Sequence, residues 1–168
     1  MLSMTEAGDI LNLVETSTVE SLAADAWLGT DGTGGIALIG RRGLRRRRMY
    51  AAHELPALIV AASRLVPAPA ASPAGTHDLD VVLEVEAIGA GADHEALTVR
   101  MRTIAAELRR WLADQEAAGG NRLDGLLESG DGSIMPGPTE LVDDAREERT
   151  SLVRARIEAT VRLRVAAA

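Results

Sequence analysis

The chain has 168 residues, of which 46% are hydrophobic, so its composition predicts one globular domain over residues 1–168 and argues against intrinsic disorder. Aromatic residues make up only 2% and Phe is absent, so the core must be aliphatic. The net charge of −7 disfavours nucleic-acid binding by the molecule as a whole, and the absence of Cys excludes disulfides and thiolate metal sites.

From its patterns we expect neither a membrane span nor a signal peptide in this sequence. No apolar run approaches the roughly 18 residues that a membrane span needs, so we expect no membrane contact. Residues 1–6 lack the basic and apolar stretches of a signal peptide. We therefore expect a protein that is made and kept in the cytoplasm, or carried in a particle assembled there.

The first predicted element is a helix over residues 5–28, where apolar residues recur at roughly helical spacing. Residues 16–18, Thr-Ser-Thr, are a point of interruption in this interpretation, because Ser and Thr compete for backbone hydrogen bonds. A Gly-rich loop over 30–35 follows. The apolar run 36–39 then predicts a short strand.

Two further strands are predicted before the middle of the chain. Residues 55–61 form a strand that Pro56 opens, which is tolerated because the first residue need not donate to the sheet. Over residues 79–86 apolar and polar side chains alternate, which predicts one buried and one solvated face, as in an antiparallel sheet. The stretch 66–77, rich in Pro and Ala, connects these strands.

The clearest helix covers residues 94–117, with Asp93 as its N-cap and a stop at Gly119 and Gly120. At about 1.5 Å per residue it is roughly 35 Å long, enough to cover one face of a small sheet. Its predicted core-facing stripe consists of Leu97, Met101, Ile104, Ala105, Leu108, Trp111 and Leu112.

The last third of the chain combines a weak and a strong pattern. The composition of residues 119–138 predicts loops around a short apolar turn. A strand is predicted at residues 140–142, and a turn or exposed end at residues 143–150. Residues 151–165 alternate without a break, which predicts a strand long enough to contain a bend or bulge.

The polar faces of the two alternating strands have opposite charge. We therefore hypothesise that these strands are neighbours, with acid facing Arg and each pair contributing from a few tenths of a kcal/mol to about 1 kcal/mol. The residues concerned are Glu84, Glu86, Arg154, Arg156, Arg162 and Arg164.

The sequence contains no catalytic, cofactor-binding or metal-binding motif, so we expect no enzyme activity and no cofactor. His77 and His94 stand beside acidic residues, but neither has the spacing of an H-x-x-x-H or H-E-x-x-H site. The Gly-rich stretches 29–35 and 130–137 match neither a P-loop nor a dinucleotide-binding pattern. The acidic cluster at 143–148 is mixed with Arg and is interpreted as a solvated surface.

One chemical feature is unusual: six of the eight residues from 41 to 48 are Arg. Guanidinium groups at this density can bind phosphates or an acidic patch on a protein. A solvated loop is the competing interpretation, and a protein partner is favoured over DNA because only Tyr50 lies nearby to stack on bases. The candidates for partner or DNA contact are Arg41, Arg42, Arg45, Arg46, Arg47 and Arg48.

The order of the predicted elements resembles a known family. A helix leads to the strand 54–60, then come the alternating strand 78–87, a helix that opens Asp93-His94-Glu95-Ala96, a linker and a long alternating strand. This order is similar to that of the tail terminator (tail completion) proteins of long-tailed phages, with relatives in gene-transfer agents and other tail-derived particles. The resemblance covers most of residues 5–165, rests on pattern alone and does not include the Arg run.

The resemblance implies an α+β fold, a mainly antiparallel sheet packed on one side by helices. It also implies a structural virion protein at the head-tail junction, made in the host cytoplasm. Such a protein forms a ring, typically a hexamer, which caps the tail tube, ends its polymerisation and joins the tail to the head-side connector. The implied partners are other copies of the chain, the tail tube protein and a head-tail connector or head-closure protein, with DNA in the lumen as a further candidate.

Other functions are compatible with the sequence. A head-tail connector, a head-closure protein or another tail component would equally lack catalytic motifs. A small regulatory or small-molecule-binding domain predicts a monomer or dimer with an apolar pocket. A nucleic-acid-binding module predicts salt-dependent binding through the Arg run.

Overall fold

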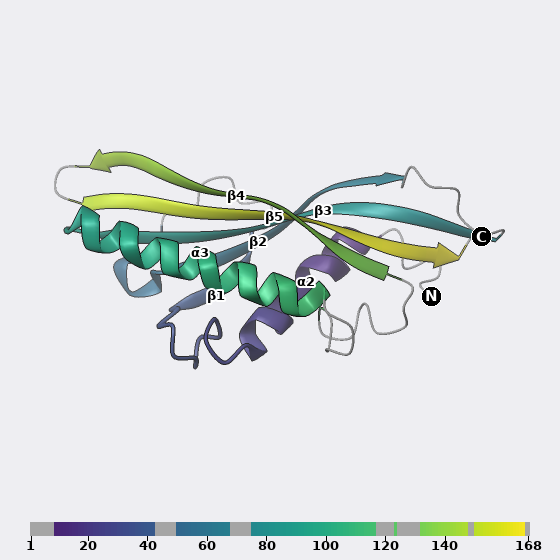
Figure 1. Cartoon of the computed structure of the whole chain (residues 1–168), viewed down its shortest axis with the longest axis horizontal. Helices are drawn as coiled ribbons and strands as arrows, with labels where there is room; N and C mark the ends of the chain where they lie inside the picture. Colours follow the sequence, from purple (N-terminus) through teal and green to yellow (C-terminus); the bar gives the residue numbers. More distant parts are fainter. Residues whose placement is uncertain are drawn as a thin grey trace.

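The computed structural model of the chain describes residues 9–42, 50–67, 75–116, 123, 132–147 and 150–166. In this part of the chain, two helices lie against one face of a five-stranded sheet (Figure 1). The strand order is β1-β2-β3-β5-β4, and only β1 and β2 are parallel. The predicted α+β class, with a mainly antiparallel sheet and helices on one side, is confirmed. The strands are β1 (Leu38–Arg41), β2 (Ala57–Pro67), β3 (Thr76–Gly91), β4 (Gly132–Glu147) and β5 (Thr150–Ala166).

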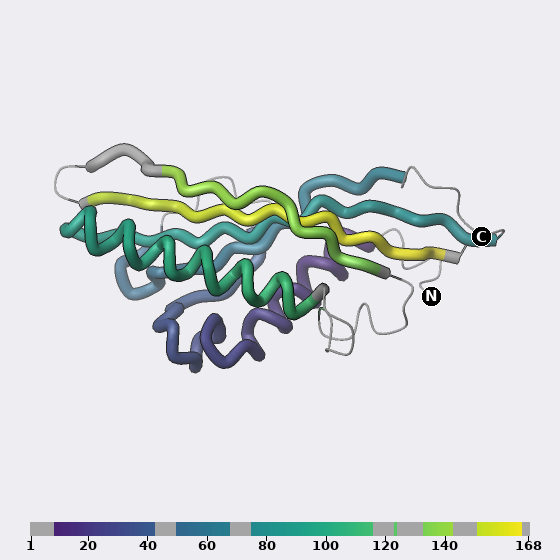
Figure 2. The backbone as a smooth tube through the Cα atoms, viewed as in Figure 1, coloured from purple at the N-terminus to yellow at the C-terminus, as the bar shows by residue number. Residues whose placement is uncertain are grey.

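The centre of the sheet is the long pair formed by β3 and β5. Their register runs without interruption from Thr76 opposite Ala166 to Gly91 opposite Ser151. The bulge expected in the last strand is not found in β5, because the extra residues of the sheet lie in β2 and β4. β2 has a register shift between Ala62 and Arg64, and β4 has two such shifts. The sheet is strongly twisted (Figure 2), and β4 stays paired with β5 along the edge of the twisted sheet.

One continuous core joins the two helices to the sheet. α3 (His94–Glu116) confirms the predicted helix 94–117, and all seven residues of its predicted stripe are buried. α2 (Ile10–Ala24) lies within the predicted helix 5–28, of which residues 5–8 are outside the described part. The interruption considered at 16–18 is wrong, because the Thr18 hydroxyl donates to the Val14 carbonyl and the helix continues.

The N-terminal strands are close to their predicted positions. The strand expected over 36–39 is found as β1, and the one expected over 55–61 is found as β2, which begins directly after Pro56. A short 3-10 helix, η1 (Ala52–Glu54), precedes β2. The Gly-rich segment 30–35 is a series of turns and extended residues, as predicted.

Two predictions for the last third of the chain are wrong. The loop expected over 119–138 already becomes strand at Gly132, and the turn expected over 143–150 is strand as far as Glu147. Pro136 and Pro138 suggested a loop, but β4 is an edge strand and edge strands tolerate Pro. Of the apolar turn expected nearby, Leu123 is described and buried, whereas Leu126 and Leu127 lie outside the described residues.

Replacing Asp93 with Ala is expected to lower the free energy of unfolding by about 1 kcal/mol. The Ala96 N–H donates to the Asp93 carboxylate over 3.1 Å, so Asp93 caps α3 as predicted. Urea denaturation followed by circular dichroism measures the loss. Asp93→Ser, which retains a capping oxygen, is the control, and equal losses in the two variants would contradict the capping role.

Candidate interaction surfaces

The helix-free face of the sheet carries a ladder of ion pairs between β3 and β5. The register sets Asp78 opposite Arg164, Asp80 opposite Arg162 and Glu86 opposite Arg156. The hypothesis that these strands are neighbours is therefore confirmed, and acid faces Arg at three positions, whereas Glu84 lies opposite Glu158. The nitrogen–oxygen distances are 2.8 Å for Arg164–Asp78, 2.7 Å for Arg162–Asp80, 3.3 Å for Arg156–Glu86 and 3.6 Å for Arg154–Glu86.

The acidic and Arg side chains of the ladder stay charged, and neither of the described helices α2 and α3 lies on this face of the sheet. Arg164 donates to both carboxylate oxygens of Asp78 and holds the pKa of Asp78 below its ordinary value, against the effect of burial. The hydrogen bonds to Asp80 likewise raise the pKa of Arg162. Burial acts to lower the pKa of Arg156, but contacts with acidic residues, Glu86 first, raise it overall. This face therefore presents fixed ion pairs that largely neutralise one another.

The first two residues of the Arg run lie at the end of β1. Arg41 donates from Nε to Glu15 over 2.8 Å and from Nη2 to Asn12, and Arg42 donates to Glu84 over 3.2 Å. Their side chains remain 40% and 55% exposed, and a guanidinium has five N–H donors, so each keeps donors for a further partner. Arg45, Arg46, Arg47 and Arg48 lie outside the described residues, so contact by the run stays a prediction.

The opposite edge of the sheet, β4, exposes apolar side chains. Met135, Leu141 and Val142 are 41%, 43% and 38% exposed. The first half of β4 is a poor template for another strand, because it contains Pro136 and Pro138 and its register with β5 shifts there. Residues 139–144 pair with β5 without interruption, and this stretch is called the free segment of β4. The sequence patterns predicted a strand only at 140–142, within this segment.

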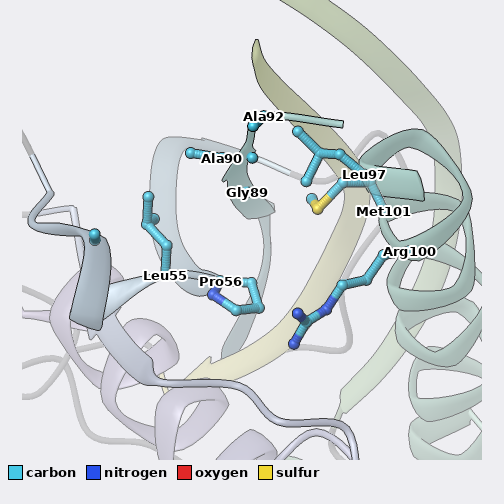
Figure 3. A pocket seen from close by; sticks show the side chains of 10 residues that line it. Leu55, Pro56, Gly89, Ala90, Ala92, Leu97, Arg100 and Met101 are labelled. Atoms are coloured by element: carbon cyan, nitrogen blue, oxygen red, sulfur yellow. The ribbon is translucent and has the colours of Figure 1, made fainter. Parts of the chain in front are cut away.

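A small pocket lies where β2 begins, β3 ends and α3 begins (Figure 3). Leu55, Pro56 and Leu97 line it, with the Arg100 side chain at its border and a volume of about 260 Å³. A Cβ at Gly89 would lie 2.5 Å from the Met101 sulfur, so a larger residue at this position would displace the Met101 side chain. The volume is below the roughly 300–1,000 Å³ of typical small-molecule sites, so the pocket gives little support to a small-molecule function.

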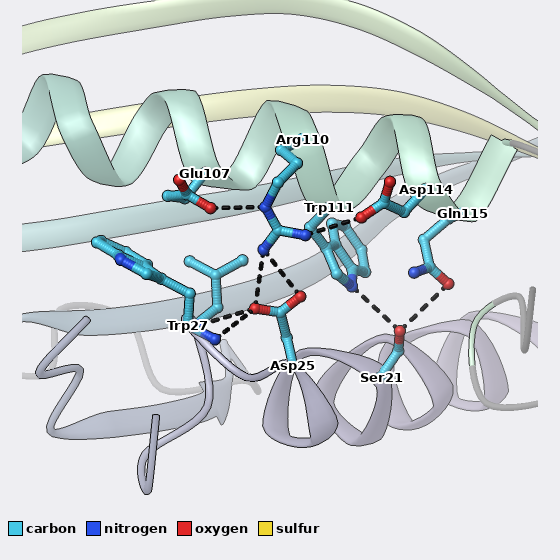
Figure 4. A network of polar contacts seen from close by, with 9 residues as sticks. Ser21, Asp25, Trp27, Glu107, Arg110, Trp111, Asp114 and Gln115 are labelled. Carbon is cyan, nitrogen blue, oxygen red and sulfur yellow. Dashed lines mark hydrogen bonds and ion pairs between the residues drawn. The ribbon is translucent and has the colours of Figure 1, made fainter. Parts of the chain in front are cut away.

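A polar network fastens α3 to the end of α2 (Figure 4). Arg110 donates to both carboxylate oxygens of Asp25 over 3.0 Å and also binds Glu107 and Asp114. Asp25 in turn accepts the N–H groups of Trp27 and Leu28, which fixes the turn after α2. Burial acts to raise the pKa of Asp25, but these backbone and Arg110 hydrogen bonds outweigh it and lower the pKa.

Asp25→Asn is expected to destabilise the protein at neutral pH by about 1–2 kcal/mol, because it removes a charged acceptor that holds two backbone N–H groups and Arg110. Since the folded-state pKa of Asp25 is lowered, its stabilisation is complete above the unfolded pKa of about 4 and disappears as the pH falls through the folded value. Denaturation of both proteins between pH 7 and pH 2 measures this. A stability difference that does not shrink at low pH would contradict the assignment.

Within the described residues, no three His, Asp or Glu side chains come together as a group that could hold a metal ion. None of the described helices is both long enough and apolar enough to cross a membrane. No family model and no curated protein matches the sequence. The function must therefore be inferred from the surfaces of the molecule. Among the described residues, the edge strand β4 and the Arg-bearing end of β1 both offer groups to a partner.

Proposed function

We propose that the protein is a structural component of a phage tail or a tail-derived particle. In this proposal the chain forms a homo-oligomeric ring, a hexamer, at the head-tail junction of the virion. The ring caps the tail tube, ends its polymerisation and joins it to a head-tail connector or head-closure protein. DNA passes through its lumen, and the Arg run provides contacts to a partner or to this DNA.

The observation that carries the proposal is the exposed edge strand β4. Monomeric proteins usually protect such an edge, because unpaired backbone groups and apolar side chains invite another strand. Here Leu141 and Val142 are both more than a third exposed, on a stretch with regular strand pairing. An edge of this kind suits a protein whose surface is completed by assembly. The α+β fold, with helices on one face of the sheet, agrees with what the resemblance implies.

The proposal is tested by the mass of the purified protein and by its binding to tail tubes. We expect a native mass of six times 17.7 kDa, either alone or once tubes are present. Electron microscopy should show one layer of the protein at a tube end, and its addition during tube assembly should stop elongation. Tubes without the protein are the control. A strict monomer that neither binds tube ends nor limits their length would overturn the proposal.

A connector or head-closure role is separated from the tail terminator role by the same microscopy. Particles of each kind, isolated heads and isolated tubes, are incubated with the protein and imaged. Binding to heads in the absence of any tube would favour the connector. Binding to tube ends that do not carry heads is the result expected for a terminator.

A further inference from the structure

We propose that the copies join edge to edge, with the free segment of β4 in one copy pairing with β1 of the next. The sheet then continues from copy to copy, and every contact has one β4 and one β1. This inference rests on the proposed ring, because a head-to-tail contact between two different surfaces is what closes a ring. Strands β1 and β4 are the two ends of the described sheet, so both have one edge without a strand partner there.

Charge argues against the alternative in which two β4 edges pair with each other. The sequence of the free segment contains Glu140, Asp143 and Asp144 and no basic residue. Pairing it with itself would bring these acidic residues together, and like charges across a strand pair are destabilising. The other end of the sheet has the opposite sign, since β1 ends at Arg41 and is followed by Arg42. The two edges are therefore complementary in charge.

The strand directions suit this contact. β1 is parallel to β2. The other three neighbouring pairs, β2–β3, β3–β5 and β5–β4, are antiparallel. β1 and β4 of one copy therefore run in opposite directions. If neighbouring copies keep their helices on the same side, β1 of the next copy lies antiparallel to β4. Antiparallel pairing is slightly more stable per residue than parallel pairing, and it needs no crossover connection.

One register matches the faces of both strands. Ile39 packs against the core on the helix side, whereas Leu38 packs against a small apolar cluster, with Ile59 and Ile88, that lies apart from that core. On β4, Leu141 lies opposite the buried Ala155 and Val142 lies opposite Arg154 of the ladder. Residues directly opposite each other across a strand pair lie on the same face of the sheet. The proposed register therefore places Ile39 of one copy opposite Leu141 of the next on the helix side, and Leu38 opposite Val142 on the other face.

The same register also places charges favourably. It sets Gly40 opposite Glu140, and a Cβ added at Gly40 would meet no atom within 4 Å, so there is room for a neighbouring side chain. Arg42 then lies diagonal to Glu140, a distance that long side chains can span. Each contact therefore combines an apolar pair on each face of the sheet with one Arg–Glu pair.

Cysteine cross-linking tests this register, and the natural chain provides a background without Cys. In the variant Leu38→Cys/Val142→Cys, the two thiols of one copy are separated by four strand spacings, roughly 19 Å, which is too far for an internal disulfide. Between copies in the proposed register, they are directly opposite. Oxidation, with and without tail tubes, should therefore give a ladder of covalent species larger than the dimer on a non-reducing gel.

Matched variants control for nonspecific oxidation. Each single variant alone should stay uncross-linked, and an equal mixture of the two should give dimers only. Leu65→Cys/Val142→Cys carries an exposed thiol on β2, beyond the residues that pair with β1 and outside the proposed contact, and should not form the ladder. Circular dichroism checks that all variants fold.

The outcomes separate the two proposals. Efficient dimers of Val142→Cys alone would show that two β4 edges pair, which overturns the inference. A ring of native mass without cross-links in the double variant would also overturn it, while the proposed function stands. A protein that stays a monomer and neither binds tube ends nor limits tube length would overturn both proposals.

Discussion

Replacing Trp111 with Ala is expected to lower the free energy of unfolding by about 3–5 kcal/mol. Trp111 is the largest of the fully buried side chains, with 2% of its surface exposed. It reaches from α3 toward α2, where its indole N–H donates to the Ser21 hydroxyl over 3.1 Å (Figure 4). Truncation therefore removes a large apolar contact and leaves a cavity between the helices. Because the core has no Phe and few other aromatic groups, no neighbour can readily fill that space.

Urea denaturation followed by circular dichroism measures this loss. The fluorescence of Trp27, the other Trp of the chain, reports unfolding independently. Trp111→Phe keeps an aromatic ring and should lose less, whereas Arg102→Ala, exposed on the same helix, should stay within about 0.5 kcal/mol of the natural protein. A cost below about 1 kcal/mol for Trp111→Ala would contradict the burial of this side chain under α2 and the sheet.

The parts of the fold that the sequence predicts well are those with a regular period. In β3, β5 and α3 the side chains that face the common core recur at the period of a strand or a helix. The local sequence pattern was therefore sufficient to predict these elements. Most of β4 was not predicted, apart from residues 140–142, for the opposite reason. Pro136 and Pro138 are typical of loops, and only the presence of β5 as a partner makes a strand there possible. Whether a strand lies at the edge of a sheet depends on the tertiary structure, so it cannot be predicted from the local sequence pattern.

The same distinction applies to the charged surfaces. The ladder was predictable because acid and Arg occur at alternate positions of two strong strands. Its strongest pairs were not, since Asp78 and Asp80 become the partners of Arg164 and Arg162 only through the register. The Arg110–Asp25 contact joins residues 85 positions apart and has no periodic signal at all. Arg41 and Arg42 were predicted as candidates for partner or DNA contact, and the fold already uses part of each guanidinium internally.

Val161→Thr is expected to lower the free energy of unfolding by about 1–3 kcal/mol, although the two side chains have nearly the same shape. Val161 is fully buried in a cross-strand row, opposite Val81 of β3 and Ile134 of β4. A hydroxyl in this row has only apolar side chains as cross-strand neighbours, so its desolvation is poorly compensated. Thermal and urea denaturation of the variant measure the cost.

The neighbouring substitution Thr160→Val is the matched control, because it makes the reverse change on the opposite face of β5. Thr160 is partly exposed and lies opposite Val82 and Met135, so we expect a change of no more than about 0.5 kcal/mol. A slip of β5 by one residue would exchange the two faces and reverse the two results. A large cost for Thr160→Val with a small one for Val161→Thr would therefore reject the register. It would also reject the ion-pair ladder and the β4 edge, which depend on that register.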